Sequence, residues 1–542
     1  MYSKVISGMT LGIEGMLVDV EADISPGLPV LSLVGYLTSS VREAGERVRT
    51  AMKNSNFILP ASRITVNLSP ADIKKDGAVY YLAIALAILV CMQIIPEEKL
   101  DNVLILGELS LSGEIKPVEG VLPIVHYASK NDIKAVVLPR GNLCEASLVE
   151  GVKIIAAEDL GGLVDLLREG RAEGVTITRG GIVKNPDEAG NSIETDSRKN
   201  KNIDDHCIMD ELNMDYVNYE YDMSSVKGQD SMKRGVMLAV SGFHNILMNG
   251  AAGSGKSMIA KCIPGIMPPL SFEESIELTK IYSISGLTKN QNGLIRTRPF
   301  RSPHHTVTST ALMGGGLIPK PGEVSLSHRG VLFLDELPEY KKNVIECLRQ
   351  PMEDKRVTIS RLHAVYDFPA EFMLVAASNP CPCGHYPDRR LCHCSEREIR
   401  SFRNRISFPI MDRIDIRLEV RPVPYQALND KSPTLSSSEM RNMILAARER
   451  QLHRYRDETI KYNSELQQSL LAKYIHISDA GERLLKNEFE TSNLSARGYF
   501  RIKKLARTVA DLNDREEITE EDVYEAMFYR NTAMEERVDN IC

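Results

Sequence analysis

The stretch Ile246-Leu-Met-Asn-Gly250-Ala-Ala-Gly-Ser-Gly-Lys256-Ser257 decides the fold of the central part of this chain. An apolar run leads into a loop with the pattern G-x-x-x-x-G-K-[ST], and a helical run follows from Met258 to Cys262. This strand–loop–helix order predicts a P-loop, whose backbone N–H groups and helix N-terminus face phosphate oxygens. The alternative, a chance glycine-rich turn, does not account for these flanks. The residues expected to bind the nucleotide are Gly250, Gly253, Ser254, Gly255, Lys256 and Ser257, with the lysine on the β- and γ-phosphates and the serine hydroxyl on Mg²⁺.

Two further apolar runs end in polar side chains that suit the same chemistry. Val331-Leu-Phe-Leu-Asp335-Glu336 reads as a buried strand that carries two carboxylates at its tip. Asp335 is expected to bind Mg²⁺, and Glu336 to polarise the attacking water as general base. A second strand, Phe372 to Asn379, ends in an amide that could hold this water, although a strand-end Asn is by itself usually a turn residue. The expected cofactors are ATP and Mg²⁺.

Composition limits the class of protein. The chain has 542 residues, which predicts roughly three to four domains at about 150 residues each. The net charge of -7, from 66 basic and 73 acidic residues, excludes a uniformly basic nucleic-acid coat, so any such contact needs a local patch or a pore. No signal peptide is recognisable, and the longest apolar run, Val79 to Met92, is too short to span a bilayer. We therefore expect a cytoplasmic protein without a membrane partner.

The order of patterns along the chain predicts an α/β multidomain protein. Residues 1–167 alternate β-rich and helical runs and form one expected domain. Residues 168–225 are rich in Asn, Asp, Glu, Lys and Gly, which predicts a flexible linker. Residues 226–422 form the P-loop α/β core, and residues 436–542 are helical.

Several long motifs carry a resemblance to a known family. They include Arg298-Pro-Phe-Arg-Ser-Pro-His-His305, Pro321-Gly-Glu-Val-Ser-Leu-Ser-His328, Leu334-Asp-Glu-Leu-Pro-Glu339, Ser378-Asn-Pro-Cys-Pro-Cys383 and Asp412-Arg-Ile-Asp415. With the P-loop, they resemble the magnesium-chelatase-like AAA+ ATPases of the ComM/YifB family. The resemblance implies a Lon-protease-like (S5-like) N-terminal domain, an AAA+ core, a C-terminal helical lid and a hexameric ring. It also implies an ATP-driven DNA motor, a helicase or branch-migration factor acting on recombination intermediates, as in natural transformation.

The same resemblance assigns roles to single residues. Arg413 falls where related ATPases place the arginine finger, which acts in a neighbouring subunit's site. Arg497 falls where sensor 2 is expected on the lid, and Gly228 with Gln229 lies in the segment that lines the adenine pocket. A surface salt bridge is the alternative for each arginine. Phe408 stands where the family usually has Gly, close to the segment that presents Arg413.

The N-terminal domain lacks the residues of a Lon protease. Lys75-Asp-Gly-Ala-Val-Tyr-Tyr81 aligns with the Lon segment that carries the nucleophilic serine, and Val79 takes its place. Ile124 occupies the best position for the partner lysine. Since a valine cannot be activated as a nucleophile, we expect no proteolysis and a role in assembly or substrate docking.

Four cysteines lie close together in the sequence: Cys381, Cys383, Cys392 and Cys394. Four thiolates are a common structural zinc set, although the C-x-C pairs are tighter than the usual C-x₂-C. A reduced loop without metal is the alternative. A zinc ion here would fix the loop that follows Asn379, next to the ATP site.

A hairpin is expected between the strand that ends at Asp335 and the strand that ends at Asn379. Its sequence is Lys355-Arg-Val-Thr-Ile-Ser-Arg361-Leu-His363. By resemblance to replicative helicases, Arg361, with Lys355 and Arg356, would contact a DNA backbone inside the ring. The sequence also has an arginine-rich stretch from 389 to 417. Two interpretations of it are about equally favoured, a second stripe that contacts phosphates and a set of ion pairs.

Other readings of the sequence remain open. His304 and His305 could bind a metal, but adjacent residues on one strand point to opposite faces, which favours structural or pore roles. A chelatase-like remodeller that acts on a protein partner is the alternative function, although no acidic metal-coordinating domain is recognisable. A non-enzymatic scaffold is disfavoured by the intact Lys256, Asp335 and Glu336.

Overall fold

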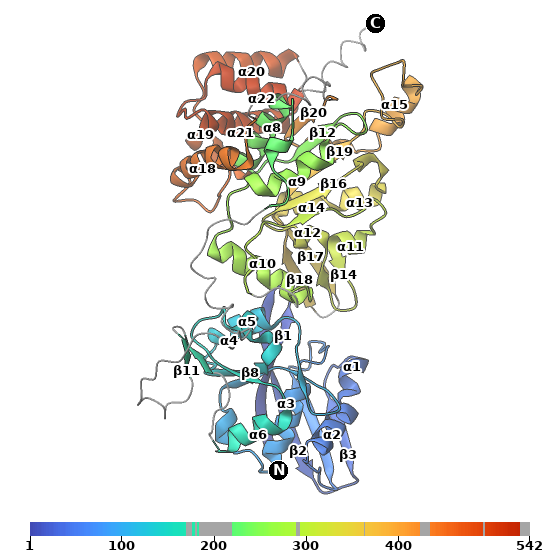
Figure 1. The fold of residues 1–542 in the computed structure, drawn as a ribbon, viewed down its shortest axis with the longest axis vertical. Coiled ribbons are helices and arrows are strands. Elements are labelled where there is room, and N and C mark those ends of the chain that lie inside the picture. The colour runs from blue at the N-terminus through green and yellow to red at the C-terminus, as the bar shows by residue number, and fades with distance from the viewer. Residues whose placement is uncertain are drawn as a thin grey trace, which may run out of the picture.

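The computed structural model describes residues 1–169, 176–178, 181–183, 219–288, 293–361, 364–422, 434–491 and 494–531. Figure 1 shows three parts along the longest axis of the molecule. An N-terminal α/β part lies at one end, a second α/β part follows, and a group of C-terminal helices lies at the other end. The predicted order of α/β, α/β and helical regions is confirmed.

The N-terminal part is built on a nine-stranded sheet with the order β11-β10-β9-β8-β5-β1-β2-β4-β3. Its long strands β1 and β2 form an antiparallel hairpin, whereas β5, β8 and β9 run parallel. All eleven residues of α3 are buried, as expected for the continuous apolar run after Val79. The strands are β1 (Tyr2–Leu11), β2 (Glu14–Ser25), β3 (Val30–Val34), β4 (Arg63–Ser69), β5 (Val103–Ile105), β8 (Ala135–Pro139), β9 (Lys153–Ala157), β10 (Thr176–Thr178) and β11 (Gly181–Val183), with the small ribbon β6 (Glu108–Leu109) and β7 (Ile115–Lys116). The helices are α1 (Ser39–Arg42), α2 (Ala44–Asn54), α3 (Tyr81–Cys91), α4 (Val121–Ser129), α5 (Leu143–Ala146) and α6 (Leu160–Glu169), with the 3₁₀ turns η1 (Glu97–Leu100) and η2 (Arg140–Asn142).

The sheet extends into the segment that the sequence predicts as a linker. Within residues 168–225, β10 pairs with β9, and β11 pairs with β10. Both are short runs rich in β-branched residues, Thr-Ile-Thr and Gly-Ile-Val, which favour strands. They were not predicted because the segment around them is mostly polar. Residues 170–175, 179–180 and 184–218 of the predicted linker lie outside the described residues.

The second part has a parallel five-stranded sheet with the order β13-β16-β19-β12-β20. Alternate residues of β16 face two cores, with Val331 and Phe333 in one and Leu332 and Leu334 in the other. The strands are β12 (Ile246–Asn249), β13 (Phe300–Arg301), β16 (Val331–Leu334), β19 (Met373–Ser378) and β20 (Ile416–Glu419), with the ribbons β14 (Gly314–Gly315) with β15 (Lys320–Pro321) and β17 (Arg356–Arg361) with β18 (Ala364–Pro369). The helices are α8 (Asp230–Gly242), α9 (Lys256–Ile266), α10 (Phe272–Ile284), α11 (Ser309–Met313), α12 (Glu323–Leu326), α13 (Lys342–Cys347), α14 (Arg349–Asp354), α15 (Glu396–Arg403) and α16 (Phe408–Asp412), with the turns η5 (Met223–Ser225) and η6 (Leu337–Glu339).

The C-terminal helices share a hydrophobic core with one face of this sheet. Residues of α18 and α21 pack with α8 and α9, as the buried side chains of Leu238, Ile263 and Val509 show. The helices are α18 (Ser437–Arg454), α19 (Gln468–Tyr474), α20 (Asp479–Thr491), α21 (Ala496–Leu512) and α22 (Glu520–Asn531), with the turn η7 (Asn463–Glu465). Among the described residues, no helix is both long and apolar enough to cross a membrane.

The two α/β parts meet where the β1–β2 turn reaches the second part (Figure 1). Gly12, at a φ of 63°, approaches β18 so closely that a Cβ atom there would lie 2.8 Å from the carbonyl oxygen of Asp367. Ile13 packs against a small cluster of apolar side chains that includes residues of α10. Lys320 of β15 pairs with Glu119 at 2.8 Å. The N-terminal part therefore contacts both ribbons of the second part, β14–β15 and β17–β18.

Candidate active site

Three polar segments meet at the carboxyl edge of the five-stranded sheet. The glycine-rich loop follows β12, Asp335 and Glu336 follow β16, and Asn379 follows β19. These strands are parallel neighbours, so their carboxyl ends lie side by side. Such an edge is where parallel α/β sheets bind ligands.

Direct contacts join the three segments. The ammonium of Lys256 donates to the carbonyl of Gly250 at 2.6 Å and to Oδ1 of Asn379 at 3.1 Å. The hydroxyl of Ser257 donates to Oδ2 of Asp335 at 2.8 Å. Burial lowers the pKa of Lys256, and the nearby charges of Asp335 and Glu336 oppose this shift. The structure thus brings together the residues that the sequence predicts to bind phosphate, to bind Mg²⁺ and to position the attacking water.

The loop has the shape that a phosphate chain needs. Gly253 and Gly255 adopt φ angles of 76° and 92°, and a Cβ atom on either would have no atom within 4 Å. Glycine is required there because other residues are strained at positive φ. The buried hydroxyl of Ser254 has no hydrogen-bond partner among the described residues. The loop can therefore bind an anion that accepts hydrogen bonds from its N–H and hydroxyl groups. The neighbouring oxygens of Ser257 and Asp335 are ligands that suit a Mg²⁺ ion.

Glu336 differs from Asp335 in its surroundings. Its backbone adopts a φ of 51°, and its N–H donates to Oδ1 of Asp335 at 3.0 Å. The side chain of Glu336 is 52% exposed. A carboxylate in this position can accept a proton from a water molecule, which is what a general base must do.

The predicted adenine segment lies at the start of α8. Gly228 adopts a φ of 59°, and the buried side chain of Gln229 donates from Nε2 to the carbonyl of Arg421 at 2.6 Å. This hydrogen bond connects the start of α8 to the end of β20. Gln229 therefore positions the segment and uses its amide group for that contact.

Arg413 and Arg497 lie at the opposite edge of the sheet. Arg413 precedes β20, which is parallel to β12, whereas the glycine-rich loop follows β12. A four-residue strand separates the two edges by about 13 Å. Neither arginine is placed to reach the glycine-rich loop of its own chain.

A residue that sequence reasoning missed connects these two arginines. Oε1 of Glu353 lies 2.6 Å from Nη2 of Arg413 and 3.7 Å from Nη2 of Arg497. Arg413 is only 5% exposed, whereas Arg497 is 64% exposed at its side chain. Phe408 begins α16 with its side chain in solvent, so it leaves the helix before Arg413 intact. Only the position of Glu353, two residues before the expected hairpin, could have pointed to it.

Asp415 anchors the start of β20. It is buried and accepts hydrogen bonds from Arg501 and from the backbone N–H of Asn245, and Nδ1 of His244 lies 3.5 Å away. Burial raises its pKa, but Arg501 and His244 outweigh that effect and keep the pKa well below the usual range. The motif Asp412-Arg-Ile-Asp415 thus contains one arginine at an edge and one buried aspartate that fixes the backbone beside it.

The four predicted cysteines converge. Their sulfur atoms all lie within 4.8 Å of one another, and Cys381 lies 3.4 Å from Cys383 and 3.7 Å from Cys392. Tetrahedral zinc with bonds of about 2.3 Å places its sulfur ligands about 3.8 Å apart, so the spacing fits this ion. The backbone N–H of His385 lowers the pKa of Cys383 to about 6. Gly384 approaches Ala252, which places the cysteine loop against the glycine-rich loop.

The predicted hairpin is the ribbon β17–β18. Arg356 and Arg361 are exposed, and Nη2 of Arg361 donates to the carbonyl of Gly316 at 3.1 Å. Lys355 instead lies at the base of the ribbon, with its ammonium 6.0 Å from the centre of the Phe243 ring. Of the predicted segment, Leu362 and His363 lie outside the described residues.

His304 and His305 do not lie on a strand. The strand β13 ends at Arg301, and the two histidines occupy a turn in which their ring centres are 4.0 Å apart. The expectation of opposite faces is therefore wrong, because the alternation of a strand does not apply in a turn. Nδ1 of His305 lies 3.8 Å from Oε2 of Glu336.

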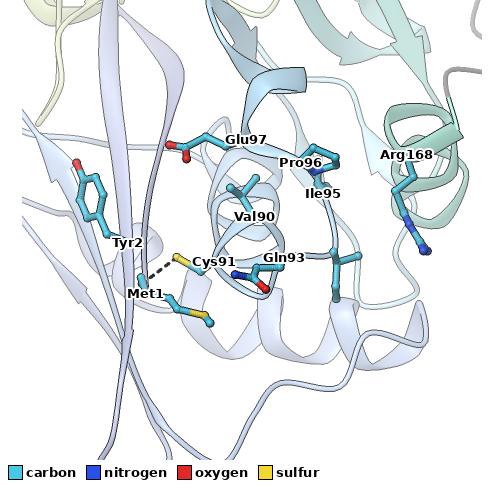
Figure 2. Close-up of a pocket in the computed structure, with 10 residues that line it drawn as sticks. Met1, Tyr2, Val90, Cys91, Gln93, Ile95, Pro96, Glu97 and Arg168 are labelled. Carbon is cyan, nitrogen blue, oxygen red and sulfur yellow. Dashed lines mark hydrogen bonds between the residues drawn. The ribbon is translucent and has the colours of Figure 1, made fainter.

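A pocket in the N-terminal part is separate from this site. Figure 2 shows it between the first residues of β1 and the end of α3, where the thiol of Cys91 donates to the carbonyl of Met1. Glu97 and Arg168 also line it. None of the residues predicted to act on a nucleotide or on DNA lines this pocket.

Comparison with known proteins identifies the family. Models of the magnesium chelatase subunit ChlI match residues 222–428 and 20–142, and a model of its C-terminal region matches residues 434–530. The chain is 36% identical to the competence protein ComM of Haemophilus influenzae over 531 residues, which are 97% of each chain. It is also 36% identical to YifB of Escherichia coli K12 over 96% of this chain and 95% of that one. The chain belongs to the ComM/YifB family.

Membership confirms the predicted fold and the general chemistry. The family is magnesium-chelatase-like and AAA+, which implies ATP hydrolysis with ATP and Mg²⁺. A partial match to Lon protease 2 of Bacillus subtilis, 27% identical over 28% of this chain and 30% of that one, supports the Lon-like character of an α/β domain. The structure places Val79 and Ile124 as buried apolar residues, with the buried ammonium of Lys75 unpaired among the described residues.

Proposed function

We propose that this protein is an ATP-driven DNA motor of hexameric form that moves strands or branches in recombination intermediates. The observation that carries the proposal is the exposed ribbon β17–β18, which presents Arg356 and Arg361 in a chain that also carries the residues of a nucleotide site. Exposed guanidinium groups bind backbone phosphates without reading sequence, as a translocating motor requires. The similarity to a protein named for competence supports a role in DNA uptake or recombination.

The proposed hydrolysis uses residues of two subunits. Gly253 and Gly255 open the loop for the phosphates, and Lys256 would leave its loop carbonyls to bind the β- and γ-oxygens. Ser257 and Asp335 would hold Mg²⁺, which neutralises developing charge on the phosphates when bound. Asn379 and Glu336 would orient and deprotonate the attacking water.

Arg413 and Arg497 supply the argument for a ring. Both lie at the sheet edge opposite their own glycine-rich loop, so they can act only on a nucleotide held by another chain. A contact that joins one edge of each subunit to the other edge of the next is heterologous, and it forms a ring when the rotation between subunits closes, as we propose here for six subunits. Glu353 would hold both arginines until the neighbour's phosphates compete for them.

The Lon-like domain is proposed to brace the motor without cleaving peptides. Val79 and Ile124 provide no nucleophile and no base. The domain contacts β18 through Gly12 and β15 through the pair Glu119–Lys320. It is therefore placed to support the two ribbons from outside.

The cysteine cluster is proposed to be a structural zinc site. Four protein ligands leave no open position for chemistry, so the ion would stiffen the loop that touches Ala252 of the glycine-rich loop. We expect the purified protein to contain about one zinc ion per chain, measured by plasma mass spectrometry. Cys381→Ser should remove most of it, whereas Cys347→Ser, which changes a cysteine outside the cluster, should not. A wild-type protein that takes up no zinc under reducing conditions would contradict the assignment.

The proposed function is tested by the effect of DNA on ATP hydrolysis. We expect single-stranded or forked DNA to raise the steady-state rate severalfold, and Arg361→Ala to abolish this rise while sparing the rate without DNA. Arg49→Ala, an exposed arginine of α2, is the neutral control. Arg390→Ala tests the arginine-rich stretch, since its side chain is 90% exposed. A loss of stimulation with Arg390→Ala alone would move the DNA contact to that stretch, and a rate indifferent to every DNA would favour the remodeller of protein partners.

A further inference from the structure

The nine-stranded sheet of the N-terminal part ends at the strand β3. This strand pairs with β4 on one side, in a parallel ladder that runs without interruption from Val30 to Val34. Beyond this ladder, no backbone hydrogen bond within the part of the chain that the structure describes reaches the five residues of β3. Such an edge presents a row of unpaired N–H and C=O groups, to which another strand can add.

This edge lacks the features that usually keep an edge strand single. Natural edges are blocked by charged side chains, by proline or by a bulge. The segment Val30-Leu-Ser-Leu-Val34 contains no charge and no proline, and its ladder with β4 has no bulge. Val30 and Val34 are 52% and 47% exposed, and Leu28 just before the strand is 81% exposed. Open backbone and exposed apolar side chains therefore lie together at this edge.

The sequence of β3 reads the same in both directions. When two copies run antiparallel with Ser32 opposite Ser32, Val30 lies opposite Val34 and Leu31 lies opposite Leu33. This arrangement is symmetric about a two-fold axis, as a contact between two identical surfaces requires. Each pair joins two apolar side chains or two hydroxyls, and no like charges meet. The edge is thus complementary along its whole length to a second copy of itself.

Both faces of β3 suit such an extension of the sheet. Leu31 and Leu33 face the core, and a Cβ atom on Gly45 of α2 would lie 3.6 Å from the Leu31 side chain. Val30, Ser32 and Val34 point to the opposite face, because side chains alternate along a strand. In the paired sheet, the leucines of the two copies would continue one apolar layer, and the valines would cover one another on the other face.

The position of β3 leaves the rest of the molecule accessible. Figure 1 shows this strand at the end of the molecule opposite the C-terminal helices. The glycine-rich loop lies in the second α/β part, away from this end. Two copies that pair through β3 would therefore join end to end through their N-terminal parts, with both nucleotide sites free.

We propose that β3 is a self-association surface, on which a second copy of this chain docks by antiparallel strand pairing about Ser32. Two nine-stranded sheets then become one. The inference does not depend on the proposed function, since the same contact joins two single chains or two rings. Five residues a side form a small contact beside the ~1,600 Å² of a standard interface, so we expect single chains to pair at about micromolar concentrations.

The test is the mass of the protein in solution, measured by sedimentation without nucleotide at chain concentrations up to about 100 µM. We expect wild type to reach twice the mass of Val34→Lys, whether the unit that pairs is a chain or a ring. The substitution puts an ammonium opposite Val30 of the other copy, and the symmetry repeats this clash within each contact. Leu111→Lys, which changes another exposed apolar residue of the N-terminal part, should keep the wild-type mass.

A pair of double variants tests the register. In Val30→Lys/Val34→Glu, the introduced lysine of each copy faces the introduced glutamate of the other, so this protein should regain the doubled mass at low salt. About 1 M NaCl should halve it again, because salt screens exposed ion pairs. Val30→Lys/Val34→Lys, with like charges opposite each other, should stay at the lower mass at low salt. Circular dichroism checks that each variant is folded.

The outcomes decide the inference separately from the proposed function. A wild type with the mass of Val34→Lys at every concentration would overturn it and would leave the edge to a strand of another protein. Doubling that Val34→Lys does not affect would place the contact elsewhere and would also overturn it. A folded Val30→Lys/Val34→Glu that stays at the lower mass would contradict the pairing about Ser32. None of these results bears on whether DNA stimulates ATP hydrolysis.

Discussion

Replacing Lys256 by alanine is expected to lower the rate of ATP hydrolysis by about a hundredfold or more. The ammonium is the one cation that touches both the glycine-rich loop and Asn379 among the described contacts, so its removal leaves the phosphate charge unbalanced. The measurement is steady-state phosphate release at saturating ATP. Glu336→Gln should lower the same rate by about 10²–10⁴ while leaving nucleotide binding intact, because an amide cannot accept the proton of water.

The control for this prediction lies on the same helix. Lys261 of α9 is exposed and points its ammonium at the ring of Tyr221, 5.0 Å from the centre. Lys261→Ala should hydrolyse ATP at the wild-type rate. If Lys256→Ala retains more than a small part of the activity, the glycine-rich loop is not the hydrolytic site.

If Arg413 acts as the proposed arginine finger on a neighbouring subunit, Arg413→Ala is expected to lower hydrolysis by about 10³ or more. Mixing Arg413→Ala with Lys256→Ala should restore activity that neither protein has alone. In a mixed ring, an Arg413→Ala subunit supplies an intact loop, and its Lys256→Ala neighbour supplies an intact arginine. With equal amounts, about a quarter of the contacts would be productive.

Folding and assembly must be checked alongside this mixing experiment. Arg413 is buried and paired with Glu353, so a thermal unfolding curve and a size measurement should accompany each variant. Arg421→Ala, an exposed arginine just after β20, should leave the rate unchanged. A mixture that remains as inactive as its components, although it assembles, would contradict catalysis between subunits.

Much of the nucleotide site could be predicted from the sequence, because its residues are adjacent along the chain to strong local patterns. The glycine-rich loop follows one strand, and the pair of carboxylates follows another. Because these strands belong to one parallel sheet, their carboxyl ends place the loop and the carboxylates at the same edge. The cysteine cluster could be predicted for the same reason, because its four residues lie close together along the chain. Each of these predictions needed only the order of residues and the geometry of one element.

The remaining features depend on contacts between distant segments. Glu353 meets Arg413 and Arg497 from three separate elements, and nothing in their spacing predicts this. His305 was assigned the alternation of a strand, but the strand ends at Arg301 and the turn brings it to Glu336. Lys355 was grouped with Arg361 by sequence, yet a left-handed backbone at its position turns it toward Phe243.

The central claim, that ATP hydrolysis moves DNA strands, is tested most directly by strand displacement from a labelled forked duplex. We predict that wild type releases the labelled strand only with ATP and Mg²⁺, and that Lys256→Ala and Arg361→Ala release none, whereas Arg49→Ala behaves as wild type. A wild type that hydrolyses ATP in the presence of the fork but leaves every duplex and branched substrate intact would contradict it.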